Sequence, residues 1–339
     1  IKHIRFYSDR TQYVFTIPVG LDPSKVAKHY VFAQVFGDSI EMVQRGNTFI
    51  LTAYRENLPA IWPYDFHHIK PHIERMRLPI IVGRSNRGIE AYDMTEWPHL
   101  LIAGETGSGK STQVRAILTT LMLTKRLDEL RLYLADMKRS EFHVFKRVAH
   151  VEKSVVDVDS LLDVLYELQA EMQRRGDMLD EEECAHIDDL SADIRPPYIV
   201  LCIDEVALLK AEKEAMARIE EMSAIGRALG VFLILSMQRP DADILDGKLK
   251  HNLTVRMAFR HSDEINSRIT LGSGEAASIP LANRGRMYWK GDGLRLVQGP
   301  YLALDQARHL LAPLKTKAQP KARPAAQIFG ILDGGVTDA

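Results

Sequence analysis

A glycine-rich segment at residues 100–112 limits what this chain can fold into more than any other stretch of the sequence. It reads LLIAGETGSGKST, an apolar run followed by a turn and then by the start of an amphipathic stretch. Four positions fit the pattern GxxxxGK[ST]: Gly104, Gly109, Lys110 and Ser111. In this pattern backbone N–H groups surround a phosphate, and the loop leads into the N-terminus of a helix. It predicts a nucleotide-binding loop, with Lys110 at the β- and γ-phosphates and Ser111 on Mg²⁺.

The residues on either side of the loop fit the structure that the pattern requires. A chance match is the alternative, because glycine is a common residue. However, Leu100–Ala103 is an apolar run typical of a buried strand. After the loop, four apolar residues recur at helical spacing: Val114, Ile117, Leu118 and Leu121. We therefore expect a strand, a phosphate-binding loop and a helix, in this order.

The overall composition is that of an ordinary globular protein. The chain has 339 residues, of which 46% are hydrophobic and 26% are charged, which gives room for a large domain and a smaller one. Its formal net charge is −1, so any surface that binds a polyanion must be local. The two cysteines, Cys184 and Cys202, indicate neither a disulfide framework nor a zinc site, which favours a reducing compartment.

The localisation is predicted from apolar and signal segments in the sequence and from its first residue. No apolar run is long enough to cross a bilayer, and no signal peptide is visible. The chain begins with Ile1 rather than methionine, which is consistent with a piece of a longer protein. We expect a cytoplasmic protein, or one held at the cytoplasmic face of a membrane by a segment upstream of Ile1.

Strand-like and helix-like segments alternate from residue 78 onward, which predicts an α/β fold with a mainly parallel sheet. Apolar runs predict strands at Pro79–Val82, Gly88–Tyr92, Arg131–Ala135, Tyr198–Ile203, Val231–Leu235 and Thr254–Phe259. Asp159 or Ser160 is expected to cap a helix that ends at Gly176. The acidic stretch Asp177–Asp193 is expected to be a solvated surface excursion.

A smaller unit precedes this sheet. Residues 5–56 are predicted to form a β-α-β-β unit, whose helix begins at Asp22-Pro23 and ends at Gly37. A proline-rich connector follows, and the C-terminus becomes a Lys/Ala/Pro linker. The predicted domains are a small α+β domain at 1–57, the connector at 58–77, a large α/β domain at 78–314, and a linker and tail at 315–339.

Two carboxylates, Asp204 and Glu205, follow the apolar run Tyr198–Ile203. In open α/β sheets, ligands bind at the carboxyl ends of the strands. There, Asp204 can hold Mg²⁺ through water, and Glu205 can polarise the attacking water. Helix N-capping is the common alternative for such a pair. Because a phosphate-binding loop lies upstream, we favour the catalytic interpretation.

Gln238 follows the next apolar run, in the segment Ser-Met-Gln-Arg-Pro at 236–240. A glutamine at the end of a strand beside the catalytic one is placed to sense the γ-phosphate or to orient water. An ordinary turn before Pro240 explains the same residues, and spacing alone leaves the two interpretations about even.

Six segments together are more specific than the phosphate-binding loop alone. They are PHLLIAGETGSGKS (98–111), ADMKRSEF (135–142), EMQRR (171–175), IVLCIDE (199–205), LILSMQRPDADIL (233–245) and DEINSRI (263–269). Their order and spacing resemble the FtsK/SpoIIIE family of DNA-translocating ATPases, over roughly residues 78–303. The resemblance implies a RecA-like P-loop NTPase core that forms hexameric rings and threads double-stranded DNA, using ATP and Mg²⁺.

The resemblance also assigns roles to positions of this chain. ATP would be bound by the loop residues Gly104, Glu105, Thr106, Gly107, Ser108, Gly109, Lys110, Ser111 and Thr112. Ser111 and Asp204 would hold Mg²⁺. Glu205 would be the catalytic base, and Gln238 would be the sensor.

A ring ATPase also needs an arginine from the neighbouring subunit, because charge develops on the transferred phosphoryl group. Arg174 and Arg175 are the first candidates, and Arg268 is the second. The alternative for the first two is that they complement a helix C-terminus.

Contacts to DNA are predicted just after the sensor strand. Lys248, Lys250 and His251 are expected in a loop, where they could contact phosphates in the lumen of a ring. Lysines in a loop are more often simply solvated, which is the alternative.

Two departures from the family narrow the prediction. No segment after the motor is long enough for the DNA-reading winged-helix module of chromosome-segregating members. The tripeptide 236–238 is Ser-Met-Gln instead of the family's more usual Ala-Thr-Gln. The first departure, together with the opening VFTIPVGLDPSKVAKHYVFAQVFG (14–37), favours compact members that couple plasmids or integrative elements to a conjugation channel. A relaxase or channel proteins would then be further partners.

Two other functions stay open. One is a protein-translocating ATPase like those of type VII secretion systems, which share the same motor. The other is an ATP-dependent adaptor that recruits a substrate without processive pumping. Glu205 speaks against the adaptor, because an adaptor has no need of a hydrolytic base.

Overall fold

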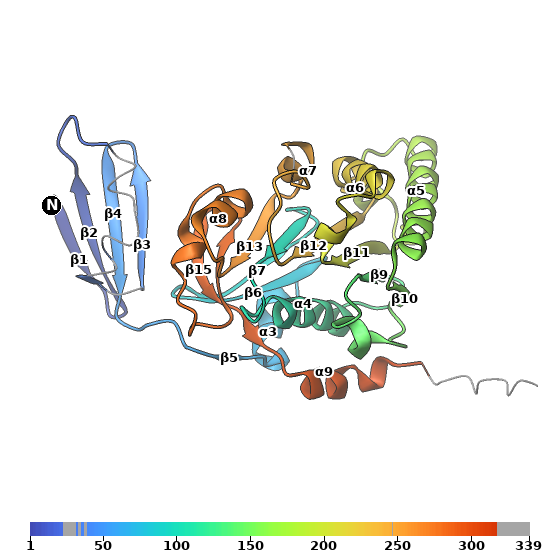
Figure 1. Cartoon of the computed structure of the whole chain (residues 1–339), viewed down its shortest axis with the longest axis horizontal. Coiled ribbons are helices and arrows are strands. Elements are labelled where there is room, and N and C mark those ends of the chain that lie inside the picture. The colour runs from blue at the N-terminus through green and yellow to red at the C-terminus, as the bar shows by residue number, and fades with distance from the viewer. Residues whose placement is uncertain (23–31, 33–34, 37–38, 246, 317–339) are drawn as a thin grey trace, which may run out of the picture.

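One large sheet dominates the residues described by the computed structural model, which are 1–22, 32, 35–36, 39–245 and 247–316 (Figure 1). Over these residues it has ten strands in the order β10-β9-β11-β12-β8-β13-β14-β15-β6-β7. They are β6 (Pro79–Ser85), β7 (Gly88–Asp93), β8 (Leu100–Ala103), β9 (Leu130–Asp136), β10 (Val151–Val155), β11 (Tyr198–Asp204), β12 (Val231–Met237), β13 (Val255–Phe259), β14 (Arg286–Lys290) and β15 (Leu294–Gln298). From β10 to β13 the strands run parallel, and the others extend the sheet in antiparallel fashion. The predicted α/β fold with a mainly parallel sheet is confirmed.

Helices cover both faces of this sheet (Figure 1). They are α3 (Phe66–Ile73), α4 (Lys110–Thr124), α5 (Val158–Glu181), α6 (Lys213–Ile225), α7 (Gly247–Asn252), α8 (Glu264–Leu271) and α9 (Leu304–Leu311). In the view of Figure 1, α3, α4 and α9 lie below the sheet, whereas α5 and α6 lie above it. Within the described residues, no helix is both long and apolar enough to cross a bilayer.

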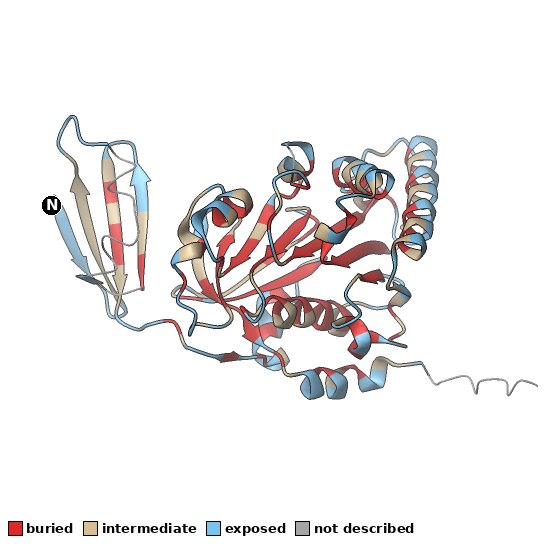
Figure 2. Ribbon diagram, in the orientation of Figure 1, coloured by how far each residue is buried: buried red, intermediate tan, exposed pale blue. Residues whose placement is uncertain are grey.

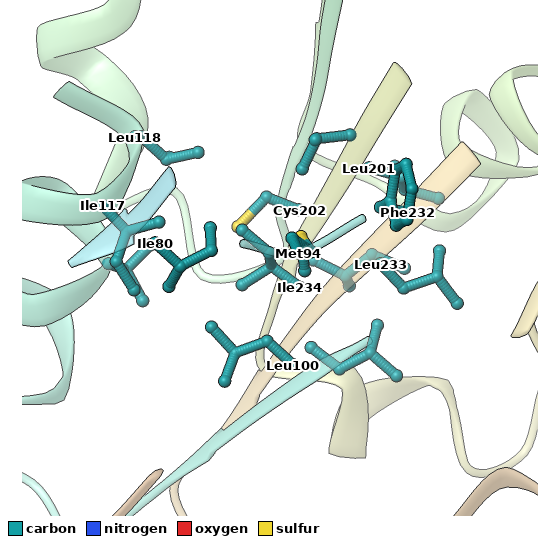
Figure 3. Close-up of a cluster of buried hydrophobic side chains, with 14 of the residues drawn as sticks. Ile80, Met94, Leu100, Ile117, Leu118, Leu201, Cys202, Phe232, Leu233 and Ile234 are labelled. Atoms are coloured by element: carbon teal, nitrogen blue, oxygen red, sulfur yellow. The ribbon is translucent and has the colours of Figure 1, made fainter. Parts of the chain in front are cut away.

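The central strands are buried along their whole length (Figure 2). Every residue of β11 and β12 is buried, which explains why both read as continuous apolar runs instead of alternating ones. Figure 3 shows side chains from these strands beside Leu100 of β8 and Ile117 of α4. Both of these residues are 0% exposed, so the helical face predicted after the loop packs into the core.

The N-terminal part of the chain forms a separate antiparallel sheet, at the left of Figure 1. Its strands are β1 (His3–Phe6), β2 (Arg10–Thr16), β4 (Thr48–Tyr54) and β3 (Ile40–Arg45), in this spatial order. A turn at residues 46–47 joins β3 to β4, whereas β1 is a strand beyond those of the predicted β-α-β-β unit. The helix predicted between Asp22 and Gly37 lies almost wholly outside the described residues. An ion pair of 2.7 Å between Glu41 Oε2 and Arg87 Nη2 links this sheet to the β6–β7 turn.

The connector predicted at 58–77 contains more structure than its prolines indicate. It holds α3, whose Ile69 and Ile73 are buried in the core of the large domain. It also holds β5 (Trp62–Pro63), which pairs with β16 (Pro300–Tyr301) near the other end of the chain. The proposed domain boundaries remain predictions, and only Lys315 and Thr316 of the predicted C-terminal linker are described.

Helix α5 is longer than the sequence indicated. Its N-cap is Asp157, whose carboxylate accepts a hydrogen bond from the Ser160 N–H. The helix continues past Gly176, so both the predicted start and the predicted end are wrong. Leu179 is buried, and burying it offsets the roughly 1 kcal/mol that a glycine costs inside a helix. The first turn of the predicted acidic excursion is therefore helical.

His99, directly before β8, is expected to make stability depend on pH. Its ring is buried, with Nδ1 accepting from the Leu233 N–H at 2.9 Å and Nε2 at 3.1 Å from the Ser223 carbonyl oxygen. Burial lowers the pKa of His99 to about 4, whereas an unfolded chain has a pKa of about 6.5. The stabilisation is therefore fully present above pH 6.5 and is lost as the pH falls toward 4.

We expect the free energy of unfolding in urea to fall by about 2 kcal/mol more between pH 7.5 and pH 5 in the wild type than in His99→Gln. Glutamine keeps hydrogen-bonding groups at this position but does not titrate. Parallel pH dependence in the two proteins would contradict the role given to His99.

Candidate nucleotide-binding and hydrolysis site

The glycine-rich loop joins β8 to α4 and leaves no room for side chains at two of its glycines. A Cβ atom on Gly104 would lie 2.5 Å from Cβ of Phe259, and one on Gly109 would lie 2.8 Å from Cα of Gly285. Gly109 also has a φ of 117°, in the region that favours glycine. Helix α4 begins at Lys110, so its N-terminal N–H groups lie at the loop and favour an anion there. The predicted strand, loop and helix are confirmed.

Lys110 lies in a buried polar cluster at the carboxyl ends of β11 and β12. Its Nζ is 2.9 Å from Asp204 Oδ1 and 3.0 Å from Ser236 Oγ. The Ser236 hydroxyl also donates to Asp204 Oδ1. Lys110 and Asp204 are 5% and 4% exposed, and Ser236 is 0% exposed. The motif lysine and the predicted acidic residue therefore meet, although they are far apart in sequence.

Glu205 follows Asp204 and has a strained backbone. Its φ of 59° and ψ of 56° are left-handed, a conformation that costs a non-glycine residue about 1–3 kcal/mol. The buried carboxylate accepts from the Gln238 N–H at 3.1 Å and from Lys138 Nζ at 2.7 Å. It makes no side-chain capping bond to the helical turn that follows, so the capping alternative does not describe this residue. Strained residues held by such contacts concentrate at functional sites.

Gln238, the first residue after β12, connects this glutamate to the phosphate-binding loop. Its backbone N–H contacts Glu205, and its side-chain Oε1 accepts from Thr106 Oγ1 at 3.1 Å. A change at the loop could therefore reach Glu205 through one residue. In the unusual tripeptide, Ser236 contacts Asp204 and Met237 is fully buried, so each position has a structural role.

Lys138 belongs to the family-like segment ADMKRSEF (135–142), but the sequence predicts no role for it at the site. It lies in the loop after β9. Asp136 fixes this loop, because its carboxylate accepts from the N–H groups of Ser140, Glu141 and Phe142 at 2.9–3.1 Å. This clamp holds the loop that carries Lys138 next to Glu205.

We expect Lys138→Ala to lower kcat for ATP hydrolysis about ten- to a hundredfold and to leave KM nearly unchanged, because Glu205 loses an orienting contact while the phosphate-binding loop stays intact. Lys138→Arg should restore most of the rate. Lys146→Ala, which removes an exposed lysine of the same region, is the matched control. A rise in KM with unchanged kcat would contradict the expected role.

A cleft of about 480 Å³ opens beside the loop. Its walls include Gly107, Gly109 and Lys110–Gln113, together with Gln238. They also include residues outside the predicted set: Ile61, Glu141, Arg284, Gln298 and Tyr301. Glu141 belongs to the family-like segment ADMKRSEF (135–142). The other four come from distant segments without a motif, so no sequence signal could have found them. The volume is in the range of small-ligand sites.

The predicted magnesium ligands are suitable in kind, although of the two only Ser111 lines the cleft itself. Ser111 is the second residue of α4 and lines the cleft. Asp204 contacts Lys110 and Ser236 through Oδ1. Among the described residues no side chain bonds its Oδ2, so Oδ2 is available for a metal-bound water. Hydroxyl and carboxylate oxygens are the ligands that Mg²⁺ prefers.

None of the arginines proposed to act on a neighbouring subunit lines this cleft. Arg175 is 1% exposed and donates at 2.7 Å to the carbonyl oxygens of Leu229 and Pro197, just before β12 and β11. In this position it ties α5 to the amino edge of the sheet. The side chains of Arg174 and Arg268 are 51% and 64% exposed, and each pairs with a glutamate of its own helix.

The lysines expected to contact DNA lie on α7, a short helix, and not in a loop. Lys248 is exposed and pairs with Glu220 at 3.3 Å. Lys250 is partly buried, and burial together with the charges of Arg256 and Lys290 lowers its pKa. Lys250, Arg256 and Lys290 therefore form a basic cluster that the sequence did not indicate.

Comparisons with known proteins agree with this geometry. The profile of the FtsK/SpoIIIE family matches residues 66–196. The chain is 32% identical over 262 residues to a DNA translocase FtsK of Treponema pallidum, which covers 73% of this chain and 32% of the relative. It is 33% identical over 254 residues to that of Staphylococcus aureus strain COL, which covers 69% of this chain and 32% of the relative. The chain spans about a third of the length of these curated relatives.

Solved structures share the fold. A monomer of the pCW3 conjugation coupling protein TcpA with ATPgS has a TM-score of 0.68 and 23% identity, and the match covers 93% of each chain. The cytoplasmic domain of the type VII secretion ATPase EccC of Thermomonospora curvata has a TM-score of 0.64 and 24% identity, covering 78% of this chain and 33% of that one. From the family match, the relatives and the site together, the chain belongs to the FtsK/SpoIIIE family and carries its P-loop ATPase core.

Proposed function

We propose that this chain is the ATP-hydrolysing motor of a DNA translocase. The observation that carries the proposal is the meeting of Lys110, Asp204 and Glu205 at the carboxyl edge of neighbouring parallel strands, beside a cleft of nucleotide size. This set provides a cation for the phosphates, an acid for the metal and a carboxylate for the attacking water.

The chemistry follows from these positions. The loop N–H groups and Lys110 bind the triphosphate, and Mg²⁺ held by Ser111 and Asp204 would neutralise its charge. Glu205 orients the attacking water or accepts a proton from it. The water oxygen bonds to the γ-phosphorus, the bond from that phosphorus to the β–γ bridging oxygen breaks, and ADP and phosphate leave. Gln238 transmits the state of the loop to Glu205, because it contacts both Thr106 and Glu205.

The motor would work as a hexameric ring of identical subunits. Charge on the transferred phosphoryl group then has to be stabilised from the neighbouring subunit. Exposure supports Arg174 or Arg268 for this role over Arg175, whose guanidinium is buried in contacts within its own subunit.

The substrate of the motor would be DNA, in line with the relatives, which are DNA translocases. We take this DNA to be double-stranded. Of the two lysines predicted to contact DNA, Lys250 is the better candidate, because Lys248 is paired with Glu220. The charges of Arg256 and Lys290 add positive potential beside Lys250. The match to a conjugation coupling protein over nearly the whole chain supports a role in conjugative transfer. Such a role would place the motor at the cytoplasmic face of the membrane, with a relaxase or channel protein as partner.

Rates of ATP hydrolysis with different polymers test the substrate. Duplex DNA should raise the rate of the chain at least about tenfold, and the stimulation should fall steeply with salt because phosphate contacts release counterions. Single-stranded DNA and a signal peptide of a secreted protein serve as comparisons. Stimulation by the peptide but not by duplex DNA would reject the proposal in favour of a secretion-type ATPase. ATP binding without turnover would favour an adaptor.

A further inference from the structure

Part of the cleft beside the loop has a wall that phosphate binding does not require, formed by Ile61 and Tyr301. Ile61 and Tyr301 both line this cleft, and they are 63% and 55% exposed. Phosphates and Mg²⁺ need N–H groups, cations and oxygen ligands, whereas these two residues offer apolar and aromatic surface. A large apolar pair left open at the edge of a polar site indicates a ligand with an apolar part.

The backbone that carries this pair is fixed on both sides. Tyr301 belongs to β16, and Ile61 directly precedes β5, which pairs with β16 in parallel. The Tyr301 carbonyl oxygen accepts from the Tyr64 N–H at 3.0 Å. The neighbours Trp62 and Leu302 are buried, 7% and 0% exposed, and anchor both segments in the core. The backbone that carries the two exposed side chains is therefore fixed before any ligand binds.

The position of Tyr301 relative to α4 indicates which part of a bound nucleotide the wall would contact. The first turn of α4, from Lys110, lines the phosphate part of the cleft. Arg115, about one turn further along α4, donates to the carbonyl oxygen of Leu302 at 2.8 Å, directly after Tyr301. The segment that carries Tyr301 therefore runs beside the start of α4, in the same cleft as the phosphate site. A nucleotide has its base on the far side of the ribose from its phosphates.

We propose that Tyr301 and Ile61 form the binding surface for the purine base of the nucleotide whose phosphates bind at residues 104–112. The inference rests on the proposed nucleotide site and adds the residues that hold the base. The tyrosine ring provides a stacking surface, and the isoleucine side chain covers apolar area beside it. Stacking depends on ring area and not on a pattern of hydrogen bonds, so the pair should accept adenine and guanine alike.

The affinities of the chain for two probes, measured in the absence of DNA, test the proposal. One is Mg²⁺ with ATP, and the other is Mg²⁺ with inorganic triphosphate, which has no base. Tyr301→Ala should raise the Kd for ATP about tenfold or more and change the Kd for triphosphate less than about twofold. Tyr301→Phe should bind ATP like the wild type, and Ile61→Ala should show a smaller loss than Tyr301→Ala. Lys110→Ala is the opposite control, because it should weaken both probes.

Equal weakening of ATP and triphosphate in Tyr301→Ala would overturn the proposal, as would unchanged ATP affinity. Because Tyr301 and Ile61 are mostly exposed, truncating them should leave the fold intact, which the thermal midpoints of the variants check. The readout is binding in the absence of DNA. A chain that binds ATP through this pair but is not stimulated by DNA would refute the proposed translocase and leave the base site standing.

Discussion

Replacing Glu205 by glutamine is expected to abolish ATP turnover and to leave ATP binding intact. Loss of a general base or water-orienting carboxylate typically costs about a hundred- to ten-thousandfold in rate. Glutamine has nearly the shape of glutamate and can still accept from the Gln238 N–H through its amide oxygen. It cannot form the ion pair with Lys138, and it cannot take a proton from water.

The comparison should be made by single-turnover hydrolysis together with equilibrium binding of ATP. Glu221→Gln, which changes an exposed glutamate on α6, is the matched control and should behave as the wild type. A Glu205→Gln variant that hydrolyses ATP at more than a few per cent of the wild-type rate would remove Glu205 from the role of base.

Replacing Lys110 by alanine is expected to affect both catalysis and folding. The variant loses the cation that binds the phosphates, so ATP affinity and turnover should both be lost. It also leaves Asp204 buried with Ser236 but without its cation. Removing one partner of a buried ion pair typically costs about 3–5 kcal/mol of stability.

The two effects can be separated with a second substitution. Lys110→Ala combined with Asp204→Asn removes the uncompensated charge, so urea denaturation should show that most of the lost stability returns. Turnover should remain absent, because neither the cation nor the acid is present. If the double variant were no more stable than Lys110→Ala alone, the ion pair would not be what holds this cluster together.

The site could be predicted from sequence where local chemistry determines it. The loop at 104–112 is a contiguous pattern whose glycines are needed by close packing against Phe259 and Gly285. Asp204 and Glu205 follow a strand buried on both faces, which gives a continuous apolar run that is readily recognised. The parallel arrangement then brings the two segments to the same edge of the sheet.

The remaining parts depend on long-range packing that has no sequence signature. Ser236 and Lys138 belong to the site because the fold places β12 and the loop after β9 beside β11, and their sequence positions do not indicate this. The proposed base-binding surface joins residue 61, in the predicted connector, to residue 301, near the C-terminal end of the large domain. The end of α5 was wrong because burial of Leu179 outweighs the helix-ending tendency of Gly176. Arg175 is a sequence candidate for acting on a neighbouring subunit, but the fold buries its guanidinium against backbone carbonyl oxygens.

The central claim, that ATP hydrolysis at this site drives movement along DNA, is tested most directly by displacement of a third strand from a duplex. A labelled oligonucleotide bound as a triplex at one end of a linear duplex reports arrival of a motor. The wild-type chain should release it only with ATP and Mg²⁺, later for a longer duplex, and Glu205→Gln should bind the duplex without releasing it. Wild-type protein that hydrolyses ATP on duplex DNA but never releases the third strand would contradict the account.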